Sequence, residues 1–223
     1  ADPRAAETVL APDTWFERTL EARARVAAID WTPALFELVD ALGLGTAASR
    51  IDVPRLRAVR SGGHDDVRAA PAYFAHRDTW YANPVAQVNV WIAMYDIGPG
   101  AGCEFFPSAF DRAVRNDSER FAFDTFEREG GFQAVTGSGA RVYPRALDEA
   151  EWGAPVSFAM QRGECLLFSA AQLHRTAAHR IGRSRFSVDF RVVDDEDLRT
   201  GAGAPCVDVR CSGDASRTYR GRL

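Results

Sequence analysis

The chain has 223 residues, of which 46% are hydrophobic and 26% are charged, and its formal net charge is −4. This length and composition are typical of one globular domain, here residues 1–223, with a sizeable core. The arginines are scattered along the chain, so no basic patch for nucleic acid or an anionic membrane surface is indicated. We therefore expect a small-molecule substrate, and the sequence does not indicate an oligomeric state.

The cysteines and the hydrophobic runs bear on the compartment. The four cysteines have irregular spacing and no CxxC pair, which is typical of neither a disulfide framework nor a zinc site. They are Cys103, Cys165, Cys206 and Cys211. The longest apolar runs, such as Val88 to Tyr95, are much shorter than the roughly 18 residues of a membrane span. We expect a cytoplasmic protein that does not cross a membrane.

Two helices are predicted before any strand, over residues 13–28 and 32–43. The second follows Thr32 and Pro33 and ends at Gly43, and its apolar positions recur with helical spacing. These positions are Leu35, Leu38, Val39 and Leu42. Their spacing indicates that the helix packs one face against a sheet.

From Pro54 onward the hydrophobic pattern changes to period two, which predicts short strands. We expect them near residues 55–60, 73–80, 86–96, 103–106, 155–159, 164–169 and 184–193. A further helix is predicted over residues 118–129, capped by Ser118 and ended by Gly130. It would lie in an insertion between strands. Many short strands favour a sandwich or barrel, with a core over about residues 54–195.

Two of these strands carry polar residues on one face. Asn89 and Trp91 alternate with Val88 and Val90, so the apolar set is expected to meet the helices. In the last strand Arg185 has the parity opposite to its apolar neighbours. Such a polar face is either solvated or, in a barrel, lines a cavity.

The candidate metal ligands are two histidines and an aspartate. His76 and Asp78 stand at i and i+2 of a predicted strand, which places both side chains on one face. Such a pair alone is a common coincidence, but a later strand is followed by His174, which supplies a third ligand. Two histidines and one carboxylate form the facial triad of iron(II) oxygenases and leave positions for a bidentate co-substrate and for O2. His179 is the competing third ligand.

Arg185 follows His174 by eleven residues, which permits a loop and a return along an adjacent strand. A guanidinium facing the metal would bind the far carboxylate of a chelated 2-oxo diacid such as 2-oxoglutarate. Thr176 is expected to assist and Trp91 to form a wall of this pocket. Arg183 shares the parity of Arg185 and is the alternative residue for this role. The other interpretation of either arginine is an ion pair with an acidic residue at the surface.

Together these segments resemble the phytanoyl-CoA dioxygenase family of 2-oxoglutarate oxygenases over roughly residues 56–193. The matching segments read His76-Arg77-Asp78, Val88-Asn89-Val90-Trp91, Gly102-Cys103-Glu104-Phe105-Phe106-Pro107-Ser108, Gly163-Glu164-Cys165-Leu166-Leu167-Phe168, His174-Arg175-Thr176 and Arg185. The resemblance implies a mainly β, double-stranded β-helix (jelly-roll, cupin-like) fold with flanking helices. It also implies Fe(II), 2-oxoglutarate and O2 as the reactive partners, with His76, Asp78 and His174 as catalytic metal ligands. The turn after Pro107 departs from the family, since it reads Ser-Ala-Phe where Gly-Ser-His is common.

The substrate side is less specified. The string His-Arg-Asp-Thr-Trp-Tyr from position 76 is similar to the branch that oxidatively cyclises sugars in orthosomycin and hygromycin-type antibiotics. A stacking and hydrogen-bonding wall for a polyhydroxylated ring is expected from four side chains. They are Trp80, Gln87, Asn89 and Tyr95.

Two other functions fit the same ligands. One is a zinc or manganese hydrolase or isomerase on a cupin-like barrel, which needs no oxo-acid. The other is a catalytically silent binding protein that keeps the barrel. His64 lies in a polar turn and is expected at the surface or in a lid, whereas Arg57 and Arg60 are either surface charges or substrate contacts.

Overall fold

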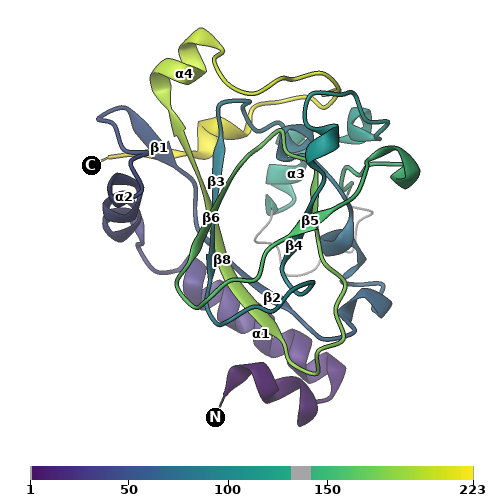
Figure 1. The fold of residues 1–223 in the computed structure, drawn as a ribbon. Coiled ribbons are helices and arrows are strands. Elements are labelled where there is room, and N and C mark those ends of the chain that lie inside the picture. Colours follow the sequence, from purple (N-terminus) through teal and green to yellow (C-terminus); the bar gives the residue numbers. More distant parts are fainter. Residues whose placement is uncertain (1, 132–141, 223) are drawn as a thin grey trace.

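The computed structural model describes residues 2–131 and 142–222, and two antiparallel sheets form its centre (Figure 1). The larger sheet has the order β6-β3-β8-β1-β9, and β2 also pairs with β8. Its strands are β1 (Ser49–Ile51), β2 (Arg55–Val59), β3 (Val88–Ala93), β6 (Cys165–Ser169), β8 (Arg185–Asp194) and β9 (Arg220–Gly221). The smaller sheet, of order β5-β4-β7, contains β4 (Cys103–Phe105), β5 (Val156–Ser157) and β7 (His174–Thr176).

The ten-residue strand β8 organises the larger sheet. It pairs with β3 along one edge, and along the other edge with β2 first and β1 afterwards. The register places Asn89 opposite Arg191 and Trp91 opposite Asp189. Because directly opposed residues project to the same face, the polar face of β3 and that of β8 form one surface.

Helix α2 (Thr32–Ala41) covers the other face of this sheet. Phe36 and Val39 pack there against Val90 of β3 and Phe190 of β8, and all four side chains are buried. The expected orientation of β3 is therefore confirmed: its apolar set meets a helix and its polar set faces inward. The chain thus forms the double-stranded β-helix class expected from the sequence, with antiparallel sheets and few helices.

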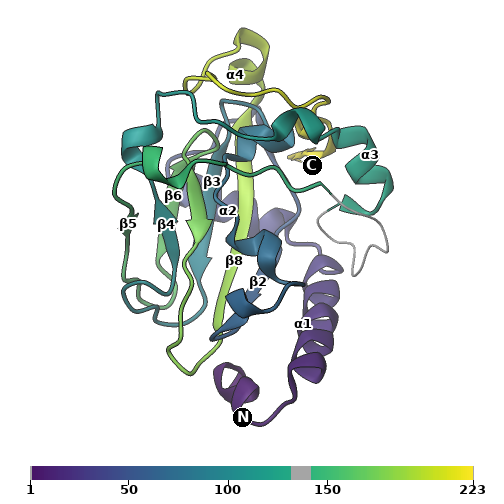
Figure 2. The same ribbon diagram turned by 90° about the vertical axis from the view of Figure 1, so that its right-hand side faces the viewer.

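Three further α-helices lie outside this packing. Helix α1 (Pro12–Ala27) runs beside β2, as Figure 2 shows from the side, and α4 (Asp195–Thr200) continues directly from β8. Helix α3 (Phe123–Arg128) lies in the long connection between β4 and β5, as predicted for the insertion. It is shorter than expected, because residues 118–120 form a separate 3₁₀ turn and α3 has no side-chain cap.

The strand predicted over residues 73–80 is wrong. Residues Ala70–Tyr73 and Asp78–Tyr81 are 3₁₀ turns, the first begun by Pro71, and between them only His76 forms a β-bridge. The sheet also extends beyond the expected bounds of 54–195, since β1 and β9 both belong to it. These strands have two or three residues each, too few for a visible period-two pattern.

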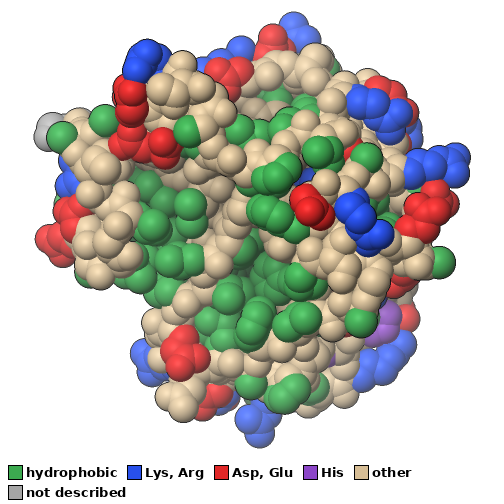
Figure 3. Space-filling model, turned by 45° about the horizontal axis from the view of Figure 1, so that its top comes forward, with side chains coloured by type: hydrophobic (Ala, Val, Ile, Leu, Met, Phe, Trp, Pro, Cys, Tyr) green, Lys and Arg blue, Asp and Glu red, His purple; other side chains and the backbone are tan. Residues whose placement is uncertain are grey.

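The surface agrees with the composition. On the face shown in Figure 3, positive and negative side chains are interspersed near the rim and hydrophobic side chains gather toward the middle. Within residues 2–131 and 142–222, no helix combines the length and hydrophobicity that crossing a membrane requires. All four cysteines are free thiols.

Candidate active site

His76, Asp78 and His174, which we call the triad, meet where the two sheets approach. His174 is the first residue of β7, and its backbone exchanges two hydrogen bonds with His76 (2.9 and 3.0 Å). Arg77 between the other two has extended backbone (φ −105°, ψ 142°), so His76 and Asp78 project to the same side although they are not in a strand. The predicted alternation of side chains therefore holds over these three residues alone.

The ring orientations leave one nitrogen of each histidine for a ligand. Nδ1 of His76 lies 2.8 Å from the carbonyl oxygen of Phe74, and Nδ1 of His174 lies 2.9 Å from that of Gln172. Backbone carbonyls accept from protonated Nδ1 atoms, which fixes the tautomer that has its lone pair on Nε2. The Nε2 atoms lie 3.5 Å (His76) and 4.0 Å (His174) from Oδ1 of Asp78.

These separations fit a single ion. Two ligands that are each about 2.0–2.2 Å from a metal can be at most about 4.4 Å apart, and both His–Asp distances are shorter. All three ligand atoms lie within 4.8 Å of one another, and no other such group occurs in the described residues. Two imidazoles and one carboxylate are the donor set typical of non-heme iron(II).

Burial sets the protonation states that a metal needs. It lowers the pKa of His174 to about 4, helped by neighbouring His76, so this imidazole is neutral at physiological pH. For Asp78, burial favours the neutral acid, but the contact with His76 and the electrostatic attraction of the two imidazoles outweigh it and lower the pKa to about 2. The triad therefore offers a carboxylate and, at His174, a neutral imidazole, the forms that coordinate metals.

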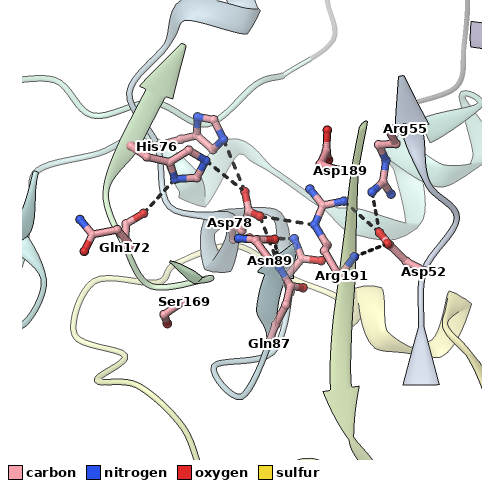
Figure 4. A network of polar contacts seen from close by, with 12 residues as sticks. Asp52, Arg55, His76, Asp78, Gln87, Asn89, Ser169, Gln172, Asp189 and Arg191 are labelled. Carbon is pink, nitrogen blue, oxygen red and sulfur yellow. Dashed lines mark hydrogen bonds and ion pairs between the residues drawn. The ribbon is translucent and has the colours of Figure 1, made fainter. Parts of the chain in front are cut away.

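Two side chains donate hydrogen bonds to Oδ2, the second carboxylate oxygen of Asp78 (Figure 4). Nε2 of Gln87 and Nε of Arg191 each donate to Oδ2 of Asp78 at 3.3 Å, and Arg191 also pairs with buried Asp52 at 2.9 Å. Asp52 in turn pairs with Arg55 at 2.5 Å. Sequence reasoning missed Arg191 and Asp52. The available signal was the parity of β8, because Arg191 lies six residues after Arg185 on the same face.

Arg77 is a second residue that the sequence did not reveal. Its side chain is 2% exposed and points away from the triad. Its Nε donates a hydrogen bond to Asp208 at 3.0 Å. The guanidinium also donates to several backbone carbonyls, among them those of Ala109 (2.6 Å) and Arg112 (2.8 Å). A buried cation with this many acceptors fixes the segment that carries two of the three ligands.

A cavity of about 820 Å³ opens beside the triad, and Arg185 lines it. The Arg185 side chain is 5% exposed, lies 5.2 Å from the ring centroid of Trp91 and donates to Ser187 at 2.7 Å. Within the described part of the chain it has no carboxylate partner, and its buried Nε has no acceptor. Thr176 and Trp91 line the same cavity. Arg183, the alternative, is exposed.

The four side chains expected to contact substrate are placed differently. Asn89 lines the cavity, and its buried Nδ2 has no acceptor among the residues described. Gln87 is buried against Asp78 instead. The expectation for Trp80 is wrong, because its fully buried ring belongs to the core and its Nε1 donates to Asp208 at 2.8 Å. Tyr95 packs edge-to-face against Phe186 and is not part of the cavity lining.

The residues left open by the sequence also have places. His179 is buried apart from the triad, whereas His64 is half-buried beside Tyr73. Arg57 pairs with Asp189 at 2.5 Å, and both line the cavity. Arg60 lines the cavity as well, so neither arginine is a simple surface charge.

Comparison with known proteins now adds to this geometry. The family model "Phytanoyl-CoA dioxygenase (PhyH)" matches residues 64–187, a span that contains the triad and Arg185. The chain belongs to the phytanoyl-CoA dioxygenase family. No curated protein matches the sequence significantly.

Several solved protein structures resemble this chain, but at low sequence identity. The non-heme monooxygenase ThoJ is 17% identical (TM-score 0.41), with 73% of this chain and 52% of that chain covered. The epimerase SnoN, in complex with Fe3+, alpha ketoglutarate and nogalamycin RO, is 16% identical (TM-score 0.42; 77% and 64% covered). EvdO2 from Micromonospora carbonacea var. aurantiaca, complexed with 2-oxoglutarate, is 9% identical (TM-score 0.45; 77% and 62% covered). The chain spans about half the length of ThoJ.

Proposed function

We propose that this phytanoyl-CoA dioxygenase family member is an Fe(II)- and 2-oxoglutarate-dependent oxygenase that acts on a small molecule. One observation carries the proposal. A triad of two histidines and a carboxylate shares a cavity with Arg185, a buried cation that has no carboxylate partner among the described residues. Metal ligands alone fit many reactions, but an unpaired arginine beside them fits a co-substrate with a free carboxylate at its far end.

Each side chain has a defined part in this proposal. The triad holds the iron, and Gln87 and Arg191 orient Asp78 from behind. Arg185 binds the distal carboxylate of 2-oxoglutarate with Thr176 assisting, while Trp91 packs under the guanidinium and excludes water from it. Bound Fe(II) with 2-oxoglutarate and O2 supplies the oxidising power, with succinate and carbon dioxide as co-products. Asn89 offers an unused donor to a ligand in the cavity.

The substrate is a small natural product, and a sugar-containing one agrees with the resemblance to the sugar-cyclising branch. The cavity supports a ligand of moderate size, because about 820 Å³ lies within the range of small-molecule sites. Its walls combine aromatic side chains, such as Phe16 and Tyr143, with polar ones, such as Thr19 and Asn89. The reaction is hydroxylation or oxidative cyclisation of that substrate.

The test is anaerobic addition of Fe(II) and then 2-oxoglutarate to the purified protein. A weak visible charge-transfer band is expected only when both are present, and it should be absent from the His174→Ala variant. Admission of O2 should then yield succinate. A zinc- or manganese-dependent hydrolase would give neither the band nor succinate, whereas a silent binding protein would give the band without succinate above background.

A further inference from the structure

Arginines are prominent in the cavity wall, and most of them have acidic partners. Arg57 pairs with Asp189, Arg68 with Asp66, and Arg191 with Asp78. Arg120 and Arg145 both pair with Asp117, at 3.5 and 3.9 Å. Within residues 2–131 and 142–222, the cavity arginines that have no ion pair are Arg23, Arg60 and Arg185.

Arg185 has a role in the proposed function, but Arg23 does not. Arg23 lies on α1, where a face of helical spacing lines the cavity. That face consists of Pro12, Trp15, Phe16, Thr19, Leu20 and Arg23. The Nε atom of Arg23 is shielded from solvent and has no acceptor among the described residues. Arg23 is half-buried, and a shielded guanidinium nitrogen without an acceptor is costly, so a site that retains one is organised to receive an anion.

The surroundings of Arg23 leave its charge without an acidic partner among the described residues. Burial and the neighbouring Arg57 cation lower its pKa to about 10, which leaves it protonated at neutral pH. Asp189, the aspartate whose charge acts on Arg23, is already bound by Arg57 through two hydrogen bonds of 2.5 and 3.1 Å. A ligand anion is therefore the missing counter-charge.

We propose that the substrate carries an anionic group, a carboxylate or a phosphate monoester, which the Arg23 guanidinium binds at the α1 wall of the cavity. This inference rests on the proposed function, because it assigns Arg185 and the triad to the co-substrate and the metal. Arg23 and Arg185 then divide the cavity between two anions. Arg185, on β8, receives the co-substrate, and Arg23, on α1, fixes the orientation of the substrate.

The experiment uses three probes of similar size: glucose, glucuronate and glucose 6-phosphate. Each is titrated anaerobically into the full chain loaded with Fe(II) and saturating 2-oxoglutarate, at constant ionic strength, and binding is followed by calorimetry and by the shift of the charge-transfer band. At least one anionic probe should bind roughly 10-fold to 100-fold more tightly than glucose, the range of a charge-assisted hydrogen bond. The anionic probe that binds more tightly shows whether the site prefers a carboxylate or a phosphate.

Variants then assign the preference to one side chain. Arg23→Gln should remove the difference between charged and neutral probes, and Arg23→Lys should keep most of it because the charge remains. Arg25→Gln is the matched control, since Arg25 is exposed two residues further along the same helix, and it should behave as the parent protein. A thermal melt and the charge-transfer band of each variant establish that it is folded and loaded.

The outcomes separate the two proposals. Failure of the band in the parent protein overturns the proposed function. A normal band with equal binding of the three probes, or with no binding of any of them, overturns the anionic substrate alone. So does an Arg23→Gln variant that keeps the preference for anions.

Discussion

Replacement of Arg185 by glutamine tests the co-substrate site most directly. Arg185 is 5% exposed, stacks on Trp91 and has one of its nitrogens fixed by Ser187, so the guanidinium is already ordered before any ligand binds. A carboxylate that binds there gains a charge-assisted pair in an enclosed site and loses little to ordering of the arginine. Arg185→Gln removes the charge and leaves a single amide donor in the same space.

The expected loss follows from this burial. Truncation of one partner of a buried, hydrogen-bonded charge pair costs about 2–5 kcal/mol, which is roughly 30-fold to several thousand-fold in affinity. The remaining glutamine amide can still donate one hydrogen bond, worth about 1 kcal/mol. We therefore expect the effect in the lower half of that range, roughly 30-fold to a few hundred-fold. Iron binding should be nearly unchanged, because the triad is untouched.

The assay is anaerobic titration of 2-oxoglutarate into the iron-loaded protein, with the charge-transfer band as the signal, and a separate iron titration. Arg183→Gln is the matched control, since this exposed arginine lies two residues earlier in the chain. It should change the apparent dissociation constant for 2-oxoglutarate by less than a factor of about three. A large effect at Arg183 with a small one at Arg185 would refute the assignment of Arg185 and show that its spacing from His174 is a coincidence.

Three further predictions use the same preparations. Alanine at any triad position should abolish succinate formation, since two protein ligands hold iron poorly, whereas His64→Ala and His179→Ala should keep most of it; an active triad variant would exclude the assignment. Arg191→Met should weaken iron binding by roughly 10-fold to 100-fold in a metal titration, the usual cost of losing an outer-shell partner, with unchanged affinity speaking against its positioning of Asp78. Turnover in chloride or bromide should give no major halogenated product by mass spectrometry, because the Asp78 carboxylate occupies the position that a halide ligand would need.

Much of the fold was accessible from hydrophobic periodicity. Strands of five or more residues and the two N-terminal helices were predicted within a few residues, because each buries a regular apolar face: Val90 and Phe190 meet Phe36 as their parity requires. The structure of the region around His76 was not predicted correctly, because contacts between residues distant in the sequence determine it. Two backbone hydrogen bonds to His174 and the burial of Arg77 against Asp208 hold this segment, and neither produces a local pattern.

The candidate site shows the same division between parity and partner choice. Along β8 the first four residues of one parity are Arg185, Ser187, Asp189 and Arg191, and all four are polar, before Val193 ends the series. Since a polar inner face between two packed sheets must satisfy its charges internally, this alternation alone predicts a lined cavity with buried ion pairs.

The alternation along the strand does not determine which acidic residue pairs with which arginine. That choice follows from the antiparallel register, which sets Asn89 opposite Arg191 and Arg57 opposite Ser187, and from the position of Asp78 at the start of a 3₁₀ turn within reach of Arg191. Arg191 consequently reaches Asp78 and Asp52, Asp189 binds Arg57, and Arg185 is left without an acidic partner among the described residues. The cation proposed for the co-substrate is thus the one that the register leaves unpaired.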